Sequence, residues 1–514
     1  MQMISKRALI MAGVAFSAIV SSATAMSALA QDAPVDTVVD DMVQEVVVTG
    51  TRIRRPNLKS ASPITSIDNA EVQLQGAIAT DKFLATLPQI EAGANENLSN
   101  GSTGRATINL RSLGTNRGLV LIDGQRILPA QATDLNFVPS TLVQRTDVLT
   151  GGASSVYGSD AMSGVVNFIL LKNLEGVKVD AQYSIYNHKN DDKYLRSIQS
   201  ARGFELADED VWDGRKTDFN IAAGANFEDG KGNLTGYFGY RKMDGVTQAN
   251  RDYSNCALTY PNSAATTYAC GGSSTHGYGS FRPLTDPNGN QILPAQTYAN
   301  AKDGSRTWVI PDSSFDYNYS PANYIQRNSE RYTGGAFLNY KFNDHAEAYG
   351  SFMYMDDHSK SQVAPSGIWT GRGFKVNCNN PLMSDQQRTI LCGSAAAADF
   401  ETTDQATTWV ALRAVAGEPR RNDMRHTNFR TVFGMRGEIV DGWNYDVSYL
   451  YASARNRANY QNDISQDKVE QALNAIEVNG VLQCVNTSGG CQPIDVFSAN
   501  GPSAEGFAFI YAPT

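Results

Sequence analysis

What the 514-residue sequence lacks already narrows its class. After the N-terminus it has no run of 18 apolar residues, which excludes a transmembrane helix there. It does not exclude a membrane β-barrel, because barrel strands are apolar only at alternate positions. The sequence also lacks the GxxxxGK[ST] phosphate loop and the GxSxG nucleophile elbow, so it gives no support to a nucleotide-binding site or a hydrolase.

Basic residues are too few for a nucleic-acid-binding protein. Lys and Arg number 43 against 52 Asp and Glu, which gives a formal net charge of −9. Nucleic-acid binding needs a clustered basic face, so no nucleic-acid partner is expected. The chain has no CxxC and its five His are scattered. We therefore expect no metal site and no cofactor.

The first 30 residues have the pattern of a secretory signal peptide. Lys6 and Arg7 form the positive region, Ala8–Val20 the apolar region, and Ala28–Ala30 the small-x-small cleavage site. A membrane anchor is the alternative, but this apolar region is short for a membrane span. We expect an exported protein whose mature chain begins near Gln31.

In an oxidising compartment the six Cys are expected to form disulfides between neighbours in the sequence. Closing a loop of about 15 residues contributes roughly 3 kcal/mol to stability in the chain-entropy model. The expected pairs are Cys256 with Cys270, Cys378 with Cys392, and Cys484 with Cys491.

Residues 107–172 alternate between short apolar runs and Gly-rich turns. Ile108–Leu110 and Leu119–Ile122 are typical of buried strands. Asp123-Gly124 then indicates a turn, because Gly takes positive φ without cost. Residues 143–169 repeat the pattern, with a strand, a Gly-rich turn, a small-residue segment and a second apolar strand.

This stretch resembles the plug domain of TonB-dependent outer-membrane receptors. Leu119–Arg126 and Asp147–Phe168 match the family's motifs, whereas Ser112 and Gln144 stand where the family usually has a glycine and an acidic residue. The resemblance implies an α/β plug domain over residues 57–172. The motif residues are Arg111, Gly114, Arg117, Asp123, Gly124, Arg126, Arg145, Gly151, Tyr157, Gly158, Gly164 and Asn167.

The segment before the plug, residues 31–56, opens acidic and leads into a run of valines. We expect residues 31–44 to be disordered, because they cannot bury a core. The Val-rich run resembles a TonB box, which would add a strand to a sheet edge of the periplasmic partner TonB. A first plug strand is the alternative. The TonB-box residues are Glu45, Val46, Val47, Val48 and Thr49.

Within the plug, Ile64–Ile67 predicts a strand, and Thr80 is predicted to cap a helix that runs to Leu87. Two polar loops, residues 91–105 and 129–136, correspond to family loops that face outward and contribute to ligand capture. Solvated connections are the alternative interpretation. The candidate ligand contacts in these loops are Asn95, Asn97, Asn100, Gln131 and Asp134.

From Glu175 onward, apolar and polar residues alternate as in barrel strands. The run from Trp443 to Tyr451, for example, has Tyr and Val on one face and Asn, Asp and Ser on the other. Together the runs predict seven strands of about ten residues each. Short turns near residues 230, 343 and 441 alternate with long loops that contain all six Cys. This asymmetry favours an outer-membrane barrel over a soluble two-sheet sandwich.

The predicted architecture is an α/β plug domain followed by antiparallel transmembrane β-barrel strands. Seven strands cannot close around a plug, since plugged transporters have about 22. We therefore expect residues 173–514 to be the N-terminal part of a longer receptor barrel, incomplete in this chain.

The resemblance implies a receptor in the outer membrane of a Gram-negative bacterium that imports a scarce extracellular solute. Such solutes include iron chelates, cobalamin and oligosaccharides. Its expected partners are TonB, an extracellular small-molecule ligand and outer-membrane lipid. The alternatives are a passive pore or adhesin-like barrel, a non-functional truncated receptor and an outer-membrane enzyme.

Overall fold

The computed structural model describes residues 64–68, 71, 80–129, 133–151, 153–262, 264–369, 371–393 and 400–512. The signal peptide, the acidic segment and the TonB box lie outside the described residues, so their assignments stay predictions. None of the helices in the described ranges is long and apolar enough to cross a membrane.

The plug is built on a five-stranded mixed sheet with the order β1-β6-β7-β4-β5. Only the β4–β7 pair is parallel. The apolar runs predicted to be strands form it, and their side chains are buried with Phe83 and Leu84 of helix α3. The strands are β1 (Ile64–Asp68), β4 (Gly118–Ile122), β5 (Gln125–Arg126), β6 (Val143–Thr150) and β7 (Gly164–Leu170).

Two further strands and two short helices complete the plug: β2 (Ile90–Ala92) pairs with β3 (Ile108–Leu110), and α3 (Thr80–Leu84) and α4 (Ser154–Tyr157) flank the sheet strands in sequence. The helix predicted to extend to Leu87 therefore ends three residues earlier. Pro88 disfavours a helical conformation at Leu87, and the chain before it closes with tighter i→i−3 hydrogen bonds from Thr86 N and Leu87 N.

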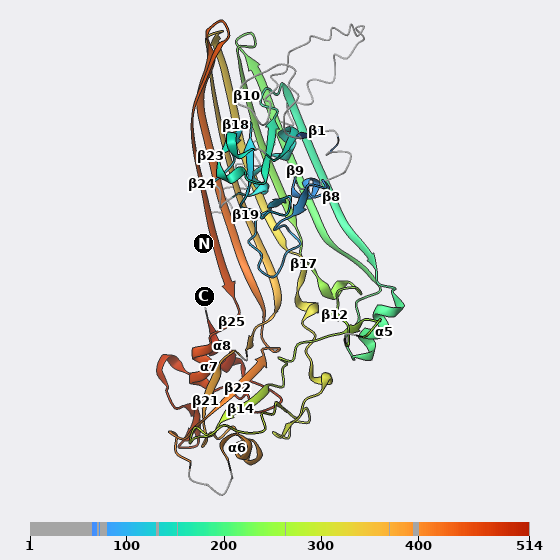
Figure 1. The fold of residues 1–514 in the computed structure, drawn as a ribbon, viewed down its shortest axis with the longest axis vertical. Coiled ribbons are helices and arrows are strands. Elements are labelled where there is room, and N and C mark those ends of the chain that lie inside the picture. Colours follow the sequence, from blue (N-terminus) through green and yellow to red (C-terminus); the bar gives the residue numbers. More distant parts are fainter. Residues whose placement is uncertain are drawn as a thin grey trace, which may run out of the picture. The chain divides into compact units, whose positions relative to one another are not determined.

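Seven long strands form the second sheet, and each pairs antiparallel with its neighbours in the order β24-β23-β19-β18-β10-β9-β8 (Figure 1). The predicted number of strands is confirmed, but the strands are 12 to 22 residues long rather than about ten. They are β8 (Gly176–Lys189), β9 (Asp210–Phe227), β10 (Gly232–Met243), β18 (Asn328–Asn343), β19 (Ala346–Pro365), β23 (Pro419–Val440) and β24 (Trp443–Gln461).

The two faces of this sheet have opposite character. Outward-facing Leu338, Phe352 and Phe433 are 48%, 50% and 62% exposed. Their sequence neighbours on the other face, such as Phe337, Met353 and Val432, are buried, as are Asn233 and Arg430. A soluble sandwich would bury its apolar face, so the pattern is the reverse of the one that a water-soluble sheet requires.

The long loops between these strands contain a second packed core. This core, here called the loop module, includes Phe281, Trp308, Phe374 and Phe497, all almost completely buried. Its central sheet has five strands in the order β16 (Trp308–Val309), β15 (Tyr298–Asn300), β14 (Ser280–Thr285), β22 (Gln405–Arg413) and β20 (Gly367–Ile368). A further strand, β21 (Gly373–Asn377), also pairs with β22. The apolar residues are spread over three loops, so no single loop shows a periodic pattern.

Three disulfides tie the loop residues together, and they join Cys256 to Cys270, Cys378 to Cys392 and Cys484 to Cys491. The strands and helices of the loops are α5 (Lys193–Ala201), β11 (Val246–Thr247), β12 (Leu258–Thr259), β13 (Ala269–Cys270), β14 (Ser280–Thr285), β15 (Tyr298–Asn300), β16 (Trp308–Val309), β17 (Tyr324–Gln326), β20 (Gly367–Ile368), β21 (Gly373–Asn377), α6 (Asp385–Cys392), β22 (Gln405–Arg413), β25 (Asp463–Ile464), α7 (Gln466–Leu473), β26 (Ala475–Val478), β27 (Val481–Cys484), α8 (Ala504–Ile510) and β28 (Tyr511–Ala512).

Gly164, at the start of β7, can be tested as a packing requirement of the plug. A Cβ there would lie 2.2 Å from Leu149 O at φ +138, whereas at Gly158 (φ +87) it would meet nothing within 4 Å. We expect Gly164→Ala to lower the free energy of unfolding by about 3 kcal/mol and Gly158→Ala by about 1 kcal/mol. Denaturant titration in detergent measures both, and equal losses would contradict the steric account.

Candidate functional site at the interface of the plug and the long strands

The polar face of the seven-stranded sheet is hydrogen-bonded to the plug at several levels. Near the short turns, Thr235 Oγ1 donates to Lys172 O at 2.9 Å. Further along, Arg430 Nε donates to Arg126 O at 3.0 Å. Lys178 Nζ donates to Thr141 O at 3.1 Å. Because each of these donors meets a main-chain carbonyl, the strands hold the plug mainly through its backbone.

At the long-loop end, the plug loop of residues 95–104 is held by the sheet and its adjoining residues. Arg327, between β17 and β18, donates to the carbonyls of Asn95 and Gly104. His426 Nε2 of β23 lies 2.8 Å from Thr103 O. Asn422 Nδ2, also on β23, donates to Ser102 O at 3.3 Å. This loop therefore forms the end of the plug that faces the long loops.

Buried charges of opposite sign meet across this interface. The plug contributes the carboxylates of Asp81, Glu96 and Asp134, which are all buried or nearly so. Facing them are cationic groups of the sheet and the residue before β18. These are Lys216, Arg241, Arg327 and Arg331. An ion pair that is lost on one side leaves a buried charge uncompensated, at a cost of about 3–5 kcal/mol. Lys216 pairs with Glu96 across the interface, whereas Arg241 and Arg331 pair with Asp218 and Asp357 of the strands. The Lys216–Glu96 pair therefore opposes movement of the plug away from the strands.

Glu96 is the best-defined member of this group. Lys216 Nζ donates to its Oε1 at 2.7 Å, and Lys82 Nζ contacts the same oxygen. Burial alone would raise the pKa of Glu96, but the two ammonium groups outweigh it and lower the pKa to about 2. Glu96 is therefore a carboxylate at any pH near neutrality.

Its neighbour Asp81 shows the opposite effect. Burial, together with the negative charge of Glu96, raises the pKa of Asp81 above its ordinary value. At Arg327 burial lowers the pKa, although Asp357, Asp134 and Glu96 act against the shift. Burial therefore disfavours the charged forms of Asp81 and Arg327, whereas the two ammonium groups favour the charged form of Glu96.

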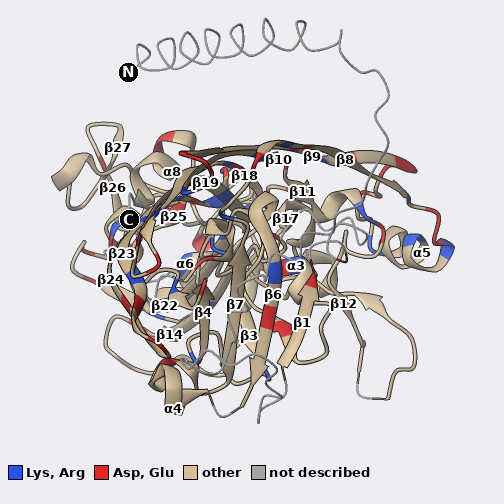
Figure 2. Cartoon of the chain, turned by 90° about the horizontal axis from the view of Figure 1, so that it is seen from above, with Lys and Arg blue, Asp and Glu red and all other residues tan. Residues whose placement is uncertain are grey.

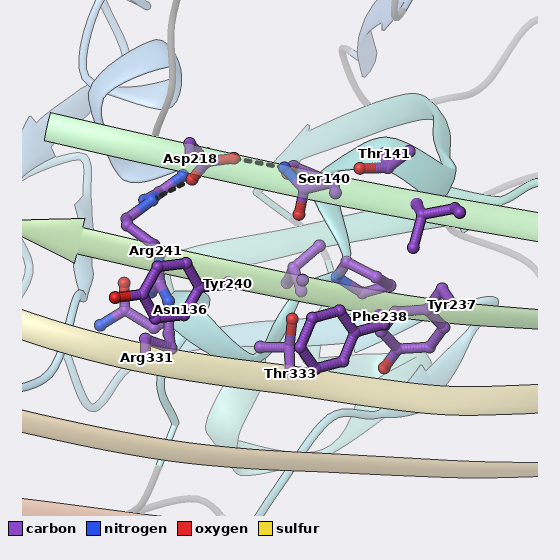
Figure 3. A pocket seen from close by; sticks show the side chains of 15 residues that line it. Asn136, Ser140, Thr141, Asp218, Tyr237, Phe238, Tyr240, Arg241, Arg331 and Thr333 are labelled. Atoms are coloured by element: carbon purple, nitrogen blue, oxygen red, sulfur yellow. Dashed lines mark hydrogen bonds and ion pairs between the residues drawn. The ribbon is translucent and has the colours of Figure 1, made fainter. Parts of the chain in front are cut away.

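Two small cavities lie in the same interface. One, of about 20 Å³, is lined by Asp81, Glu96, Arg327 and Asp357 among others. The second, of about 30 Å³, lies between plug residues 136–141 and strands β9, β10 and β18 (Figure 3). Asp218 and Arg241 form an ion pair at its edge. Volumes of this size suit one or two waters and exclude a solute molecule.

Two of the plug motif residues build the turn after β4. Gly124 N donates to Asn167 Oδ1 at 2.9 Å, and Leu170 N donates to Asp123 Oδ1 at 3.1 Å. Asp123 and Gly124 both have positive φ, which Gly adopts at no steric cost. The motif residues Asp123, Gly124 and Asn167 therefore position β4 against β7.

The motif arginines serve the plug's own structure. Arg126 pairs with Asp160 at 2.6 Å. Arg145 pairs with Asp147 at 3.0 Å, and both lie on β6, where Figure 2 shows basic and acidic segments next to each other. Arg117 donates to Leu113 O at 2.6 Å.

The remaining motif residues stand at backbone turns. Arg111 and Ser112 have φ values of 58° and 56°, so Ser112 occupies a conformation that a glycine adopts more easily. Gly114, Gly151 and Gly158 also have positive φ, and Gly158 ends the helix that contains Tyr157.

The structure places the candidate ligand contacts in different environments. The Asn95 carbonyl accepts from Arg327, Asn97 Nδ2 donates to Ile325 O at 3.2 Å, and Asn100 is exposed. Asp134 is instead fully buried, and its Oδ1 accepts from Ala106 N and Asn136 N at 3.0 Å each. It is therefore placed to support the plug rather than to meet a solute. Gln131 lies outside the described residues.

Sequence reasoning missed the buried ionic groups, although one signal was present. Arg241 and Arg331 pair in register across β10 and β18, and both fall on the inward face of their strands. The alternation of the strand sequences indicates that face. Among the described residues, no group of three His, Cys, Asp or Glu is placed to hold a metal ion.

Comparison with known proteins agrees with the plug architecture. Residues 56–165 match the family model of the TonB-dependent Receptor Plug Domain. This part of the chain is therefore a plug domain of the kind found in TonB-dependent receptors.

Similar solved structures include the siderophore receptor PiuA from Acinetobacter baumannii, which is 13% identical in sequence. The match covers 85% of this chain and 51% of that receptor, with a TM-score of 0.38. A ferric enterobactin receptor variant (PfeA) from Pseudomonas aeruginosa, in complex with enterobactin, matches at 13% identity, 79% of this chain, 58% of that chain and a TM-score of 0.32. A chain of the FpvAI–pyocin S2 complex matches at 12% identity and a TM-score of 0.36, and the match covers 86% of this chain and 46% of that chain. The chain thus spans about half to three-fifths of the length of the receptors it matches.

Replacing Glu96 with Gln should weaken the plug interface. The amide cannot neutralise Lys82 and Lys216, so we expect the free energy of unfolding to fall by about 3–5 kcal/mol at pH 7. The folded-state pKa of Glu96 lies below its ordinary value of 4.5. Its stabilising contribution is therefore present above about pH 4.5 and is lost as the pH falls toward about 2. The unfolding midpoint of the native protein should fall through this window more steeply than that of Glu96→Gln.

Glu91→Gln is the matched control for this measurement. Glu91 is exposed and accepts a hydrogen bond from Asn109 Nδ2 at 2.9 Å. Its replacement should leave the pH profile close to that of the native protein. If the Glu96 and Glu91 variants have the same profile, the ion pairs at the interface do not stabilise the plug.

Proposed function

We propose that the protein is an outer-membrane receptor that actively imports a scarce extracellular solute and is energised through TonB. The observation that carries this proposal is the seven-stranded sheet, with an exposed apolar face and a polar face covered by a plug. The exposed apolar face is suited to contact with lipid tails. The polar face is suited to the inside of a barrel that the plug fills.

The exposed face has the dimensions of a membrane-spanning band. Phe227, Phe342 and Trp443 stand at the short-turn ends of their strands, and Tyr332 and Tyr354 stand further along theirs. Tyr332 and Phe342 are ten residues apart on β18. At about 3.3 Å per residue and a tilt of about 40°, they are separated by about 25 Å, which is the height of the apolar band of outer-membrane barrels.

The outer edges of β8 and β24 have no strand partner among the described residues. An unpaired strand edge in lipid costs several kcal/mol for each unsatisfied backbone group. We propose that both edges pair with further strands in a complete barrel, and that residues 173–514 are the N-terminal part of it.

The transport cycle that we propose begins with solute binding at the long loops and the outer end of the plug. The plug blocks the lumen, and its interface with the strands holds it in place. TonB would pair with residues 45–49 and pull, and force on the chain before β1 would break the interface contacts and open a path. Residues 1–30 would serve as the signal peptide, residues 31–56 as the coupling segment and residues 57–172 as the plug. No covalent step is required, so no catalytic residue is proposed.

Deleting Glu45–Thr49 tests the energy coupling. We expect the deletion to abolish solute uptake by cells but to leave solute binding to isolated outer membranes unchanged, because the loops and the plug remain. Defined iron and carbon sources would identify a transported solute first. Unchanged uptake after the deletion would exclude TonB coupling and favour a passive pore.

The lipid-facing assignment can be tested at Phe433, which is 62% exposed. The register aligns Phe433 with Gly350, which aligns with Leu338 in the middle of the apolar band. We expect Phe433→Arg to destabilise the inserted protein by about 2–4 kcal/mol and to lower its abundance in outer membranes.

Val485→Arg serves as the control. Val485 is 42% exposed and directly follows β27 in the long loops, so an arginine there remains in water and should change abundance little. Equal effects of the two substitutions would refute the membrane orientation.

A further inference from the structure

One histidine of the long loops is buried without a full set of hydrogen-bond partners. His276, four residues before the start of β14, is 2% exposed. Its Nε2 lies 3.2 Å from Ser280 Oγ, and that hydroxyl donates its own proton to Ser274 O at 3.0 Å. Nε2 therefore carries a proton and donates it to Ser280. The other ring nitrogen, Nδ1, is a buried acceptor without a partner in the part of the chain that the structure describes.

The imidazole ring is packed against aromatic rings rather than against water. Its centre lies 5.4 Å from the ring centre of Phe315 and 6.1 Å from that of Tyr278. The ammonium group of Lys302 lies over both of these rings, at 4.3 Å from the centre of Phe315 and 5.6 Å from that of Tyr278. The aromatic surface that could attract a charged imidazole is therefore already occupied by a cation.

Two charged groups act on His276 in opposite directions. Burial is the largest effect and lowers the pKa of His276, Asp316 acts to raise it, and Lys302 lowers it further, which leaves the pKa at about 4. The carboxylate of Asp316 is itself paired with Arg202 at 3.3 Å. His276 is therefore neutral at pH 7, and no carboxylate is reserved for its charged form among the described residues.

His276 stands at a junction of the long loops. Ser273 and Tyr317 exchange two main-chain hydrogen bonds of 2.9 Å each, which tie residues 273–280 to the turn at residues 313–317. The carbonyl of His276 accepts a hydrogen bond from Arg413 N, at the end of β22, at 3.0 Å. Because Phe315 belongs to the turn and Ser280 begins β14, the imidazole connects the turn to the central sheet of the loop module.

We propose that His276 makes this junction sensitive to acid. A proton taken up at Nδ1 would place a second cation beside Lys302, and the turn at residues 313–317 would separate from residues 273–280 so that water reaches the ring. The proton comes from solvent and returns to it when the pH rises, so the change is reversible. The inference concerns the loops themselves and does not depend on the proposed transport function.

The pH range of the change follows from the protons bound in the two states. In the open state the imidazole has its ordinary pKa of 6.5, whereas in the closed state its pKa is about 4. The open state binds more protons between these values, so the closed state loses stability as the pH falls from about 6.5 toward about 4. Hydrogen bonds from Ser314 hold the pKa of the nearby Asp312 below its ordinary value of 3.8. Asp312 therefore stays charged between pH 7 and pH 5, where the open state gains its proton.

Hydrogen exchange at pH 7 and pH 5 tests the proposal on the full chain purified in detergent. After correction for the intrinsic effect of pH on exchange, we expect protection of the Ser273 and Tyr317 amides to fall about tenfold or more at pH 5. His276→Gln keeps a donor for Ser280 Oγ but cannot become charged, so its protection should change less than about twofold. His276→Arg is charged at both pH values and should show low protection already at pH 7.

His358→Gln is the matched control. The side chain of His358 is 43% exposed and lies 2.7 Å from Asp423 on the neighbouring strand, so its replacement should leave the pH response of the junction as in the native protein. The proposal is overturned if native protection is the same at both pH values, or if His276→Gln loses as much protection as the native protein. Circular dichroism establishes folding of each variant. His276→Asn is a second neutral variant, and the native measurement is decisive even where a substitution prevents folding.

Discussion

The structure depends on the opposite polarity of the two faces of its long sheet. A strand exposes alternate side chains to opposite sides, so one sequence can present Phe433 outward and Val432 and Arg430 inward. Because the outward face is apolar, the polar side chains of the sheet lie on the inward face. They are buried there and need hydrogen-bond partners. The plug satisfies them, largely through its own main-chain carbonyls. Each part therefore supplies hydrogen-bond partners to the other at their interface.

Much of this arrangement could be predicted because it depends on local periodicity. The alternation along Trp443–Tyr451 indicates a strand and its two faces, and the turn at Asp123-Gly124 follows from the backbone freedom of Gly. The expected cysteine pairs are short-range, so sequence distance was a useful guide. The plug strands likewise stand where short apolar runs occur between turns.

What could not be predicted depends on contacts between distant segments. The loop module brings Phe281, Trp308, Phe374 and Phe497 together from separate loops, and no loop contains enough apolar residues to reveal a core. The ion pair of Glu96 with Lys216 joins residues of two domains, and neither residue differs in sequence context from a solvated charge. Asp134 was expected to contact solute but is fully buried. The sequence of a polar loop does not show which of its side chains turns inward.

The way in which the strands hold the plug's outer loop has a consequence for how such a protein can evolve. Arg327, Asn422 and His426 contact the carbonyls of Asn95, Ser102, Thr103 and Gly104, and a carbonyl is present whatever the side chain is. Substitutions in this loop can therefore accumulate while its seating is preserved, provided the backbone path is kept. Descendants of one ancestral gene could therefore diversify the side chains of this loop without changes in the strands that hold it.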